Sequence, residues 1–251
     1  MCGIESHAFI MQPILAGATR RNKKDEMRRI FFIVMCTLCT TCIDAQIEVT
    51  KFLGIPVDGS KQQMISQLKT KGYKYDPTLD YLTGEFNGRD VNIHIATNNN
   101  KVYRIVLEDA LYSSETDIKI RFNTLCRQFK NNEKYLKPSL NEYEISETED
   151  ISFEMSCHNK RYEASYYQVT NQLDSVTMTN KLQEFLFSKY GKDLSNLTEE
   201  QKMDVLASSL LFYLNLYEDN SVWFMINRRY GKFGILMYYD NNHNRANGED
   251  L

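Results

Sequence analysis

Apolar residues follow two different periods along this chain, one typical of α-helices and one typical of β-strands. The segment from Ser60 to Gln63 matches a capping box, and apolar residues then recur at helical spacing up to Gly72, which predicts a first helix. The dipeptide Asn87-Gly88 precedes a strict alternation of apolar and polar residues that begins at Val91. Because this combination is the strongest short-range signal for a β-hairpin, we expect two antiparallel strands here.

The second part of the chain continues this succession of helices and hairpins. A helix is expected from Ser114, because apolar residues then recur every three or four positions. Residues 151–157 alternate between apolar and polar side chains, which predicts a strand that forms a second hairpin with residues 162–169. Helices are also expected around 182–186 and over 198–217, and strands over 222–226 and 233–239.

The order of these elements predicts the fold class. Consecutive hairpins argue against a parallel doubly wound sheet, in which single strands alternate with helices. We therefore predict an α+β protein in which antiparallel hairpins form curved sheet, with helices packed on one face. The same order suggests two related halves, residues 46–131 and 132–251, each pairing helices with curved sheet.

Residues 1–45 are predicted to be an N-terminal extension followed by a signal peptide. Arg28 and Arg29 precede the apolar run from Ile30 to Leu38, and the small residue Ala45 marks a plausible cleavage site. The apolar run is too short for a permanent transmembrane helix, which needs about 20 apolar residues. We expect an exported protein, periplasmic or secreted, with no transmembrane segment in the mature chain.

Cys42 leaves a lipoprotein open as the alternative mode of export. Leu38 lies four residues before Cys42, as in lipoprotein signals. Thr41, however, occupies the place where Gly, Ala or Ser is usual. Cleavage after Ala45 is therefore favoured.

Two cysteines, Cys126 and Cys157, follow the predicted cleavage site. An even pair in an oxidising compartment permits a disulfide between them, and two buried thiols explain the same positions. Cys157 shares the phase of Phe153 and Met155 in the predicted strand. This favours core packing, or a bond to Cys126, over nucleophilic catalysis.

Charge excludes one class of partner. Without residues 1–45 the chain carries 24 Lys and Arg against 29 Asp and Glu, a net charge of −5, and the basic residues are dispersed among carboxylates. A nucleic-acid-binding protein normally presents a clustered basic face, so we expect no nucleic-acid partner. The mature chain also has no metal-ligand spacing and no cofactor motif, so neither a metal nor a cofactor is expected.

Four residues are candidates for ligand binding: His94, Tyr162, Tyr166 and Tyr167. His94 is the best general-base candidate by type, but its alternation with Asn92 places it on the solvent face of a strand. Tyrosine rings with a polar tip suit recognition of protein or sugar. Strand propensity explains the same tyrosines without any ligand.

Four segments of the mature chain carry a resemblance to a known family: FLGIPVDG at 52–59, GEFNGR at 84–89, HNKRY at 158–162 and ANGEDL at 246–251. In these segments, and over most of the mature chain, the sequence resembles an uncharacterised family of exported proteins from anaerobic gut bacteria. The resemblance implies export and one continuous fold. It brings no established activity and no catalytic residues.

Export together with the lack of a catalytic constellation favours a non-enzymatic binding or interaction module of the cell envelope. Its partner would be a protein or a glycan. The alternative is an exported hydrolase acting on glycan or peptide, with a site assembled from dispersed acids and His94. A pocket that joins an acid to His94 would favour the enzyme, whereas an exposed aromatic surface would favour binding.

Overall fold

The computed structural model describes residues 48–170, 175–191, 197–246 and 248. The predicted signal peptide lies outside these residues. In chain order the elements are β1 (Lys51–Phe52), β2 (Ile55–Pro56), α2 (Lys61–Thr70), β3 (Lys74–Asp76), β4 (Tyr81–Phe86), β5 (Arg89–Asn98), β6 (Lys101–Asp109), α3 (Glu115–Lys130), β7 (Tyr135–Leu136), α4 (Ile151–Cys157), β8 (Glu163–Gln168), α5 (Ser175–Tyr190), α6 (Glu199–Asn215), β9 (Ser221–Arg229), β10 (Lys232–Asp240) and a 3-10 turn, η1 (Asn242–Asn244).

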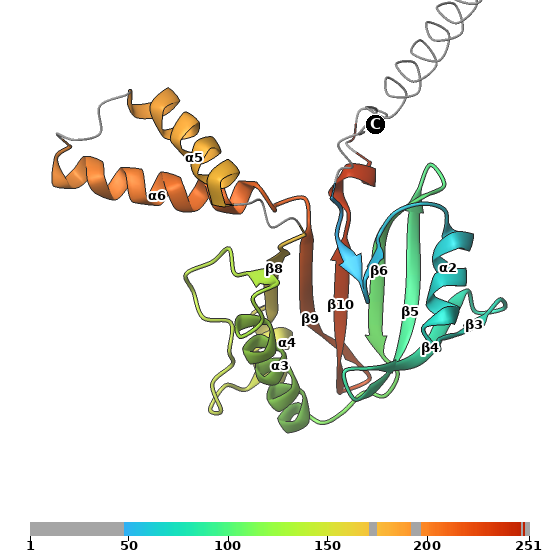
Figure 1. The fold of residues 1–251 in the computed structure, drawn as a ribbon. Helices are drawn as coiled ribbons and strands as arrows, with labels where there is room; N and C mark the ends of the chain where they lie inside the picture. Colours follow the sequence, from blue (N-terminus) through green and yellow to red (C-terminus); the bar gives the residue numbers. More distant parts are fainter. Residues whose placement is uncertain (1–47, 171–174, 192–196, 247, 249–251) are drawn as a thin grey trace, which may run out of the picture. The chain divides into compact units, whose positions relative to one another are not determined.

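Eight of the strands form one antiparallel sheet in the order β3-β4-β5-β6-β10-β9-β8-β7, and β1 pairs with β2 in a separate small hairpin (Figure 1). Helix α2 is followed by the strand group β3 to β6, and α3 is followed by the strand group β7 to β10, between whose strands α4, α5 and α6 are inserted. The last strands of the two groups, β6 and β10, pair at the centre of the sheet, with Val106 opposite Tyr238. The predicted α+β class with antiparallel sheet is confirmed.

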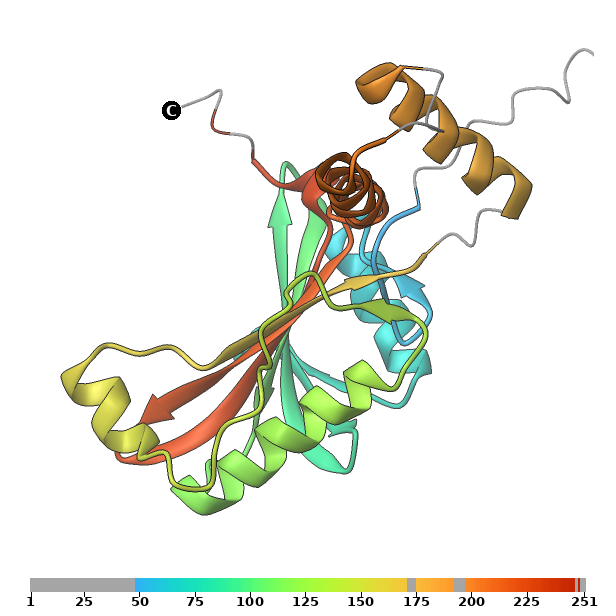
Figure 2. The same cartoon turned by 90° about the vertical axis from the view of Figure 1, so that its left-hand side faces the viewer.

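Helices α2 and α3 begin and pack as the sequence predicts. The Ser60 hydroxyl accepts the Gln63 backbone N–H at 3.3 Å, and the Ser114 side chain accepts the Asp117 N–H in the same way. Both helices lie on the same face of the sheet (Figures 1 and 2). Each directs one apolar side into the core; the buried residues are Met64, Ile65 and Leu68 of α2 and Ile118, Phe122, Leu125, Cys126 and Phe129 of α3.

The strand predicted over 151–157 is wrong, because these residues form helix α4. Two carboxylates cap the N-terminus of this helix: Asp150 accepts the Phe153 N–H at 2.8 Å, and Glu115 accepts the Ile151 N–H at 2.9 Å. Only Ile151 of this segment is buried. The predicted hairpin is therefore not formed, and β8 pairs with β7 and β9.

The described helices include none that is both long enough and apolar enough to cross a membrane.

Candidate functional site

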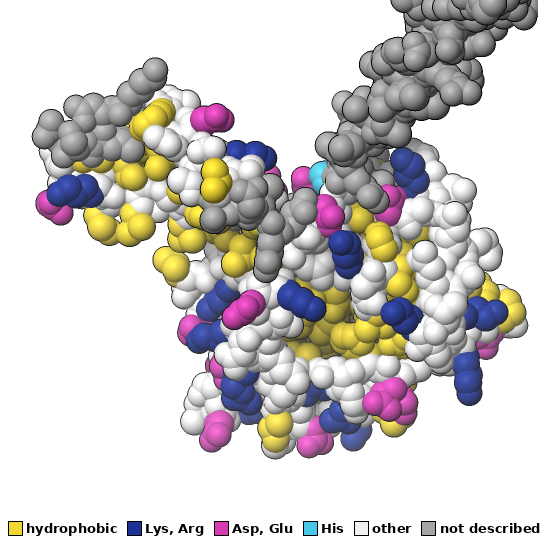
Figure 3. All heavy atoms as spheres, in the orientation of Figure 1, with side chains coloured by type: hydrophobic (Ala, Val, Ile, Leu, Met, Phe, Trp, Pro, Cys, Tyr) yellow, Lys and Arg dark blue, Asp and Glu magenta, His cyan; other side chains and the backbone are white. Residues whose placement is uncertain are grey.

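Part of one face of the sheet is left uncovered between α2 and α3, because two helices are too narrow to cover an eight-stranded sheet. Strands about 4.8 Å apart give a sheet roughly 34 Å wide, whereas two helices of about 10 Å diameter cover only some 20 Å of it. The uncovered strip is a hollow with apolar side chains at its base and basic residues at its rim (Figure 3). Three cavities follow this strip.

The cavities are continuous because neighbours share lining residues. A central cavity of about 460 Å³ shares Asn87, Leu125 and Gln128 with one of about 240 Å³. It shares Leu53, Phe86, Asn132, Tyr135 and Tyr239 with another of about 600 Å³. We call the whole the interhelix groove, and its lining comes from the β1–β2 turn, the β4–β5 turn, α3, β7 and β10.

The floor of the groove is aromatic. Tyr239 of β10 packs against Phe52, with ring centroids 4.9 Å apart, and Phe52 packs in turn against Phe86 at 5.5 Å. Complete burial raises the pKa of Tyr239 well above its ordinary value, and the neighbouring Tyr135 hydroxyl adds to this effect. The Tyr239 phenol is therefore neutral and acts only as a hydrogen-bonding group.

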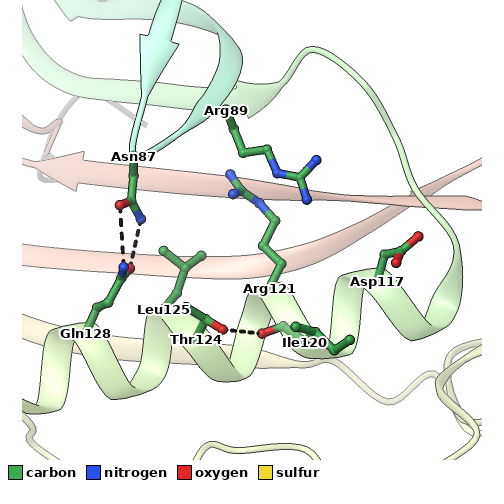
Figure 4. Close-up of a pocket in the computed structure, with 8 residues that line it drawn as sticks. All are labelled: Asn87, Arg89, Asp117, Ile120, Arg121, Thr124, Leu125 and Gln128. Carbon is green, nitrogen blue, oxygen red and sulfur yellow. Dashed lines mark hydrogen bonds between the residues drawn. The ribbon is translucent and has the colours of Figure 1, made fainter.

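One end of the groove is tied together by amides and carries arginines (Figure 4). The Asn87 side-chain amide donates to Gln128 Oε1 at 2.8 Å, which links the β4–β5 turn to α3. Arg121 is held by Asp109, with Nε 2.9 Å from Oδ2, and Arg89 extends toward Arg121 in the close-up view. No ion pair among the described residues involves Arg89.

The opposite end is also basic. Lys51 and Lys134 line the largest cavity. Lys51 pairs with Glu48, with Nζ 2.9 Å from the carboxylate, whereas Lys134 has no ion pair within the described part of the chain. The groove therefore has an apolar middle and basic residues at each end, and the end with the arginines also holds Asp117 and the Asp109 partner of Arg121.

Leu53 at the rim holds an unfavourable backbone conformation. It forms a two-residue turn with Gly54 between β1 and β2, at φ +53° and +80°. Asn-Gly is the preferred pair for such a turn, because a leucine with positive φ is strained by roughly 1–2 kcal/mol. The side chain of Leu53 is 39 % exposed, and it lines two of the groove cavities. Strain of this kind is found at functional sites, so Leu53 is a candidate ligand contact.

The predicted tyrosines do not come together at this groove. Tyr166 is fully buried, stacks on Phe129 with centroids 4.7 Å apart and donates to the Cys126 carbonyl at 3.3 Å. Tyr162 is also buried, and its hydroxyl donates to Glu149. Tyr167 is half-buried on the face of the sheet opposite α2 and α3, which we call the far face.

His94 also lies on the far face, at a second site. Its Nε2 is 3.7 Å from the Glu108 carboxylate, and both residues line a cavity of about 460 Å³. Glu108 already accepts from Arg229 at 2.6 Å and from the Tyr112 hydroxyl at 2.9 Å. Burial and then Glu108 raise the pKa of Tyr112 to about 12, so this phenol stays protonated. The lining of this cavity contains no serine, threonine or cysteine among the described residues.

The disulfide that the sequence left open between Cys126 and Cys157 is not formed in this structure. Cys126 is buried on α3 and Cys157 is exposed at the end of α4, and both are free thiols. The alternative of two buried thiols holds for Cys126 alone, because residues 151–157 form a helix and not the core-facing strand that was expected to bury Cys157. The described residues also contain no cluster of three or more His, Cys, Asp or Glu that could hold a metal ion.

The two thiols are expected to differ sharply in reactivity. Burial raises the pKa of Cys126 to about 12, so almost no reactive thiolate exists there at mildly alkaline pH. A short pulse of N-ethylmaleimide on the folded protein should label Cys157 and leave Cys126 unmodified, as peptide mass spectrometry can show. Equal labelling of both residues would contradict the buried placement of Cys126.

Sequence reasoning missed the groove because its lining comes from segments far apart in the chain. The one local signal is the pair Leu53-Gly54, in which an apolar residue occupies a turn position that favours asparagine. Comparisons with protein-family models, curated proteins and solved structures found no match.

Proposed function

We propose that this is an exported, non-enzymatic binding protein of the cell envelope that holds an extended polypeptide segment in the interhelix groove. The observation that carries the proposal is the continuity of three cavities over an aromatic floor. Concave, largely apolar sites with a few polar groups are the usual form of a binding site. Export rests on the signal peptide predicted for residues 1–45.

The lining of the groove favours polypeptide over glycan. Leu53, Leu125 and Met237 offer aliphatic and thioether contacts that bond no sugar hydroxyl. The groove follows α3 from Asp117 to Asn132, about 23 Å at 1.5 Å per residue, which an extended peptide of about seven residues spans. With basic residues at both ends, the matching segment has an apolar centre flanked by carboxylates.

The hydrolase alternative has one observation in its favour, the approach of His94 to Glu108 within a cavity. Its weakness is the lack of a nucleophile, because the described lining of this cavity contains no serine, threonine or cysteine, and Arg229 and Tyr112 already hold Oε1 of Glu108. The far-face cavity therefore supports catalysis less well than the groove supports binding.

Substitution of Leu53 tests the groove without disturbing the fold. Leu53→Asn removes the apolar contact but suits the positive φ, so we expect stability to stay within about 1 kcal/mol of the parent. Binding of a fluorescent peptide with a Leu and Phe centre and Glu flanks should weaken at least tenfold, since a lost leucine contact costs about 1.5 kcal/mol. Fluorescence anisotropy measures the affinity, and urea unfolding measures the stability.

Leu79→Asn is the matched control, because Leu79 is exposed in the β3–β4 connection and lines none of the groove cavities. This variant should bind the peptide like the parent. Equal affinity of both variants and the parent, or no binding of the peptide by the parent, would rule out the proposed groove function. Cleavage of the peptide during incubation, seen by mass spectrometry, would favour the hydrolase instead.

A further inference from the structure

The far-face cavity is lined by residues from five strands of the sheet, β4, β5, β6, β9 and β10. Its volume of about 460 Å³ lies within the range of about 300–1,000 Å³ that is typical of small-molecule sites. The Tyr112 ring packs against the sheet at Gly234, where a Cβ atom would be only 3.0 Å from the ring. Ala110 is the only aliphatic residue in the described lining. The cavity is therefore polar and aromatic, unlike the interhelix groove.

The two carboxylates of the lining are already paired with arginines. Arg229 Nη1 is 2.6 Å from Glu108 Oε1. Asp109 Oδ2 accepts from Arg121 Nε and from the Ile235 N–H, each at 2.9 Å. An anionic ligand in this cavity would lie close to Glu108, and a cationic ligand would lie close to Arg229, so each would meet a like charge. The pairing therefore favours a ligand without net charge.

Several polar groups of the lining have no hydrogen-bond partner among the residues that the structure describes. Glu108 Oε2 is 3.7 Å from His94 Nε2, which is too far for a hydrogen bond, and it accepts from no other described group. The side chains of Asn92 and Lys232 also lack a partner in the described part of the chain. Together these groups offer an acceptor, a donor and an amide that is both, which is the set that neighbouring hydroxyl groups of one ligand can satisfy.

Tyr230 adds an exposed aromatic ring to the lining. Tyr230 and Gly231 form the two-residue turn between β9 and β10, at φ +50° and +73°. Asparagine is preferred at the first position of such a turn, because a positive φ strains a tyrosine. The Tyr230 side chain is fully exposed, so packing within the fold does not explain its presence. An exposed ring beside unpartnered polar groups suits a ligand that has both an apolar face and hydroxyl groups, as a sugar ring has.

We propose that the far-face cavity binds a neutral mono- or disaccharide. One sugar ring stacks on Tyr230, and its hydroxyl groups bond to Glu108 Oε2, Asn92 and Lys232. The sugar is bound and not cleaved, because glycoside hydrolysis needs two carboxyl groups beside the scissile bond and Asp109 is held by its core partners. The cavity shares no lining residue with the interhelix groove, so this inference does not rest on the proposed groove function.

A nuclear magnetic resonance titration of the isotope-labelled full chain tests the ligand class. The neutral probes are glucose, galactose, mannose, N-acetylglucosamine, cellobiose, maltose and lactose, and the charged probes are glucosamine and glucuronate. At millimolar concentrations, at least one neutral sugar should shift the backbone resonances of Asn92, His94 and Lys232, and both charged sugars should bind more weakly than that sugar. No shift with any neutral sugar, or tighter binding of a charged sugar, would overturn the proposal.

The same substitution in two turns provides a matched test of the site. Tyr230→Asn removes the exposed ring but suits the positive φ, so the fold should be kept, and the affinity for the bound sugar should fall about fivefold. Leu53→Asn, in the β1–β2 turn at the groove, should bind the sugar like the parent. Tyr230→Asn should in turn bind the groove peptide like the parent. Equal sugar affinity of Tyr230→Asn and the parent would refute the sugar site, whereas a loss of peptide binding alone would concern only the groove.

Discussion

Replacing Tyr166 by alanine is expected to lower the free energy of unfolding by about 3–5 kcal/mol. The Tyr166 ring is fully buried, stacked on Phe129 and close to Phe224, so its removal leaves a large cavity in the core. The loss also removes the hydrogen bond to the Cys126 carbonyl. For a chain of this size the midpoint of thermal unfolding should fall by roughly 10 °C, which calorimetry can measure.

Tyr167 is the natural control because it is the same residue type, one position along the same strand, on the far face of the sheet. It is only half-buried, so Tyr167→Ala should cost about 1 kcal/mol. Similar losses for both variants would contradict the placement of the two side chains on opposite faces of β8. A loss of ligand binding in Tyr166→Ala without a loss of stability would restore Tyr166 as a binding residue.

Replacing Asp109 by alanine is expected to destabilise the fold by about 3–5 kcal/mol. Asp109 is 7 % exposed in its side chain and Arg121 is 12 % exposed, so the substitution leaves an arginine charge buried without its partner. The Ile235 N–H also loses its acceptor, at present 2.9 Å away. Asp109 thereby links β6 to both α3 and β10, and urea unfolding should report its loss directly.

Two companion variants separate the charge from the packing. Asp109→Leu combined with Arg121→Leu should recover most of the lost stability, because a buried ion pair can often be replaced by apolar residues at little cost. Glu142→Ala removes exposed ion pairs with Lys130 and Lys137 and should leave the urea midpoint nearly unchanged. If Asp109→Ala behaved like Glu142→Ala, the buried pair would not be present in solution.

Short sequence motifs correctly predicted the helices and the hairpin whose ends are determined by neighbouring residues. The capping residues Ser60 and Ser114 and the turn Asn87-Gly88 determine where α2, α3 and the first hairpin begin, and the structure confirms each of them. The strand prediction for residues 151–157 failed because their alternating apolar side chains do not form a buried face: only Ile151 is buried, and Phe153 is exposed. The Glu115 carboxylate, which is distant in sequence, stabilises the start of α4 and could not be inferred from that segment.

The groove could not be inferred for a different reason. It depends on which surfaces the packing leaves uncovered, and this follows from the strand order of the sheet rather than from any single segment. The groove exists because β6 pairs with β10 between the two helix-covered halves. Of the three predicted tyrosines, Tyr162 and Tyr166 fill the core, where their high strand propensity is as useful as at a surface, and Tyr167 lies on the far face.

The most direct test of the proposed groove function is a nuclear magnetic resonance titration of the isotope-labelled chain with the acid-flanked apolar peptide. We expect chemical-shift changes concentrated at groove residues such as Leu53, Phe86 and Gln128, which line the cavities between α2 and α3. Changes confined to His94 and Trp223 on the far face, or no changes at saturating peptide, would contradict the assignment of the groove as the binding site.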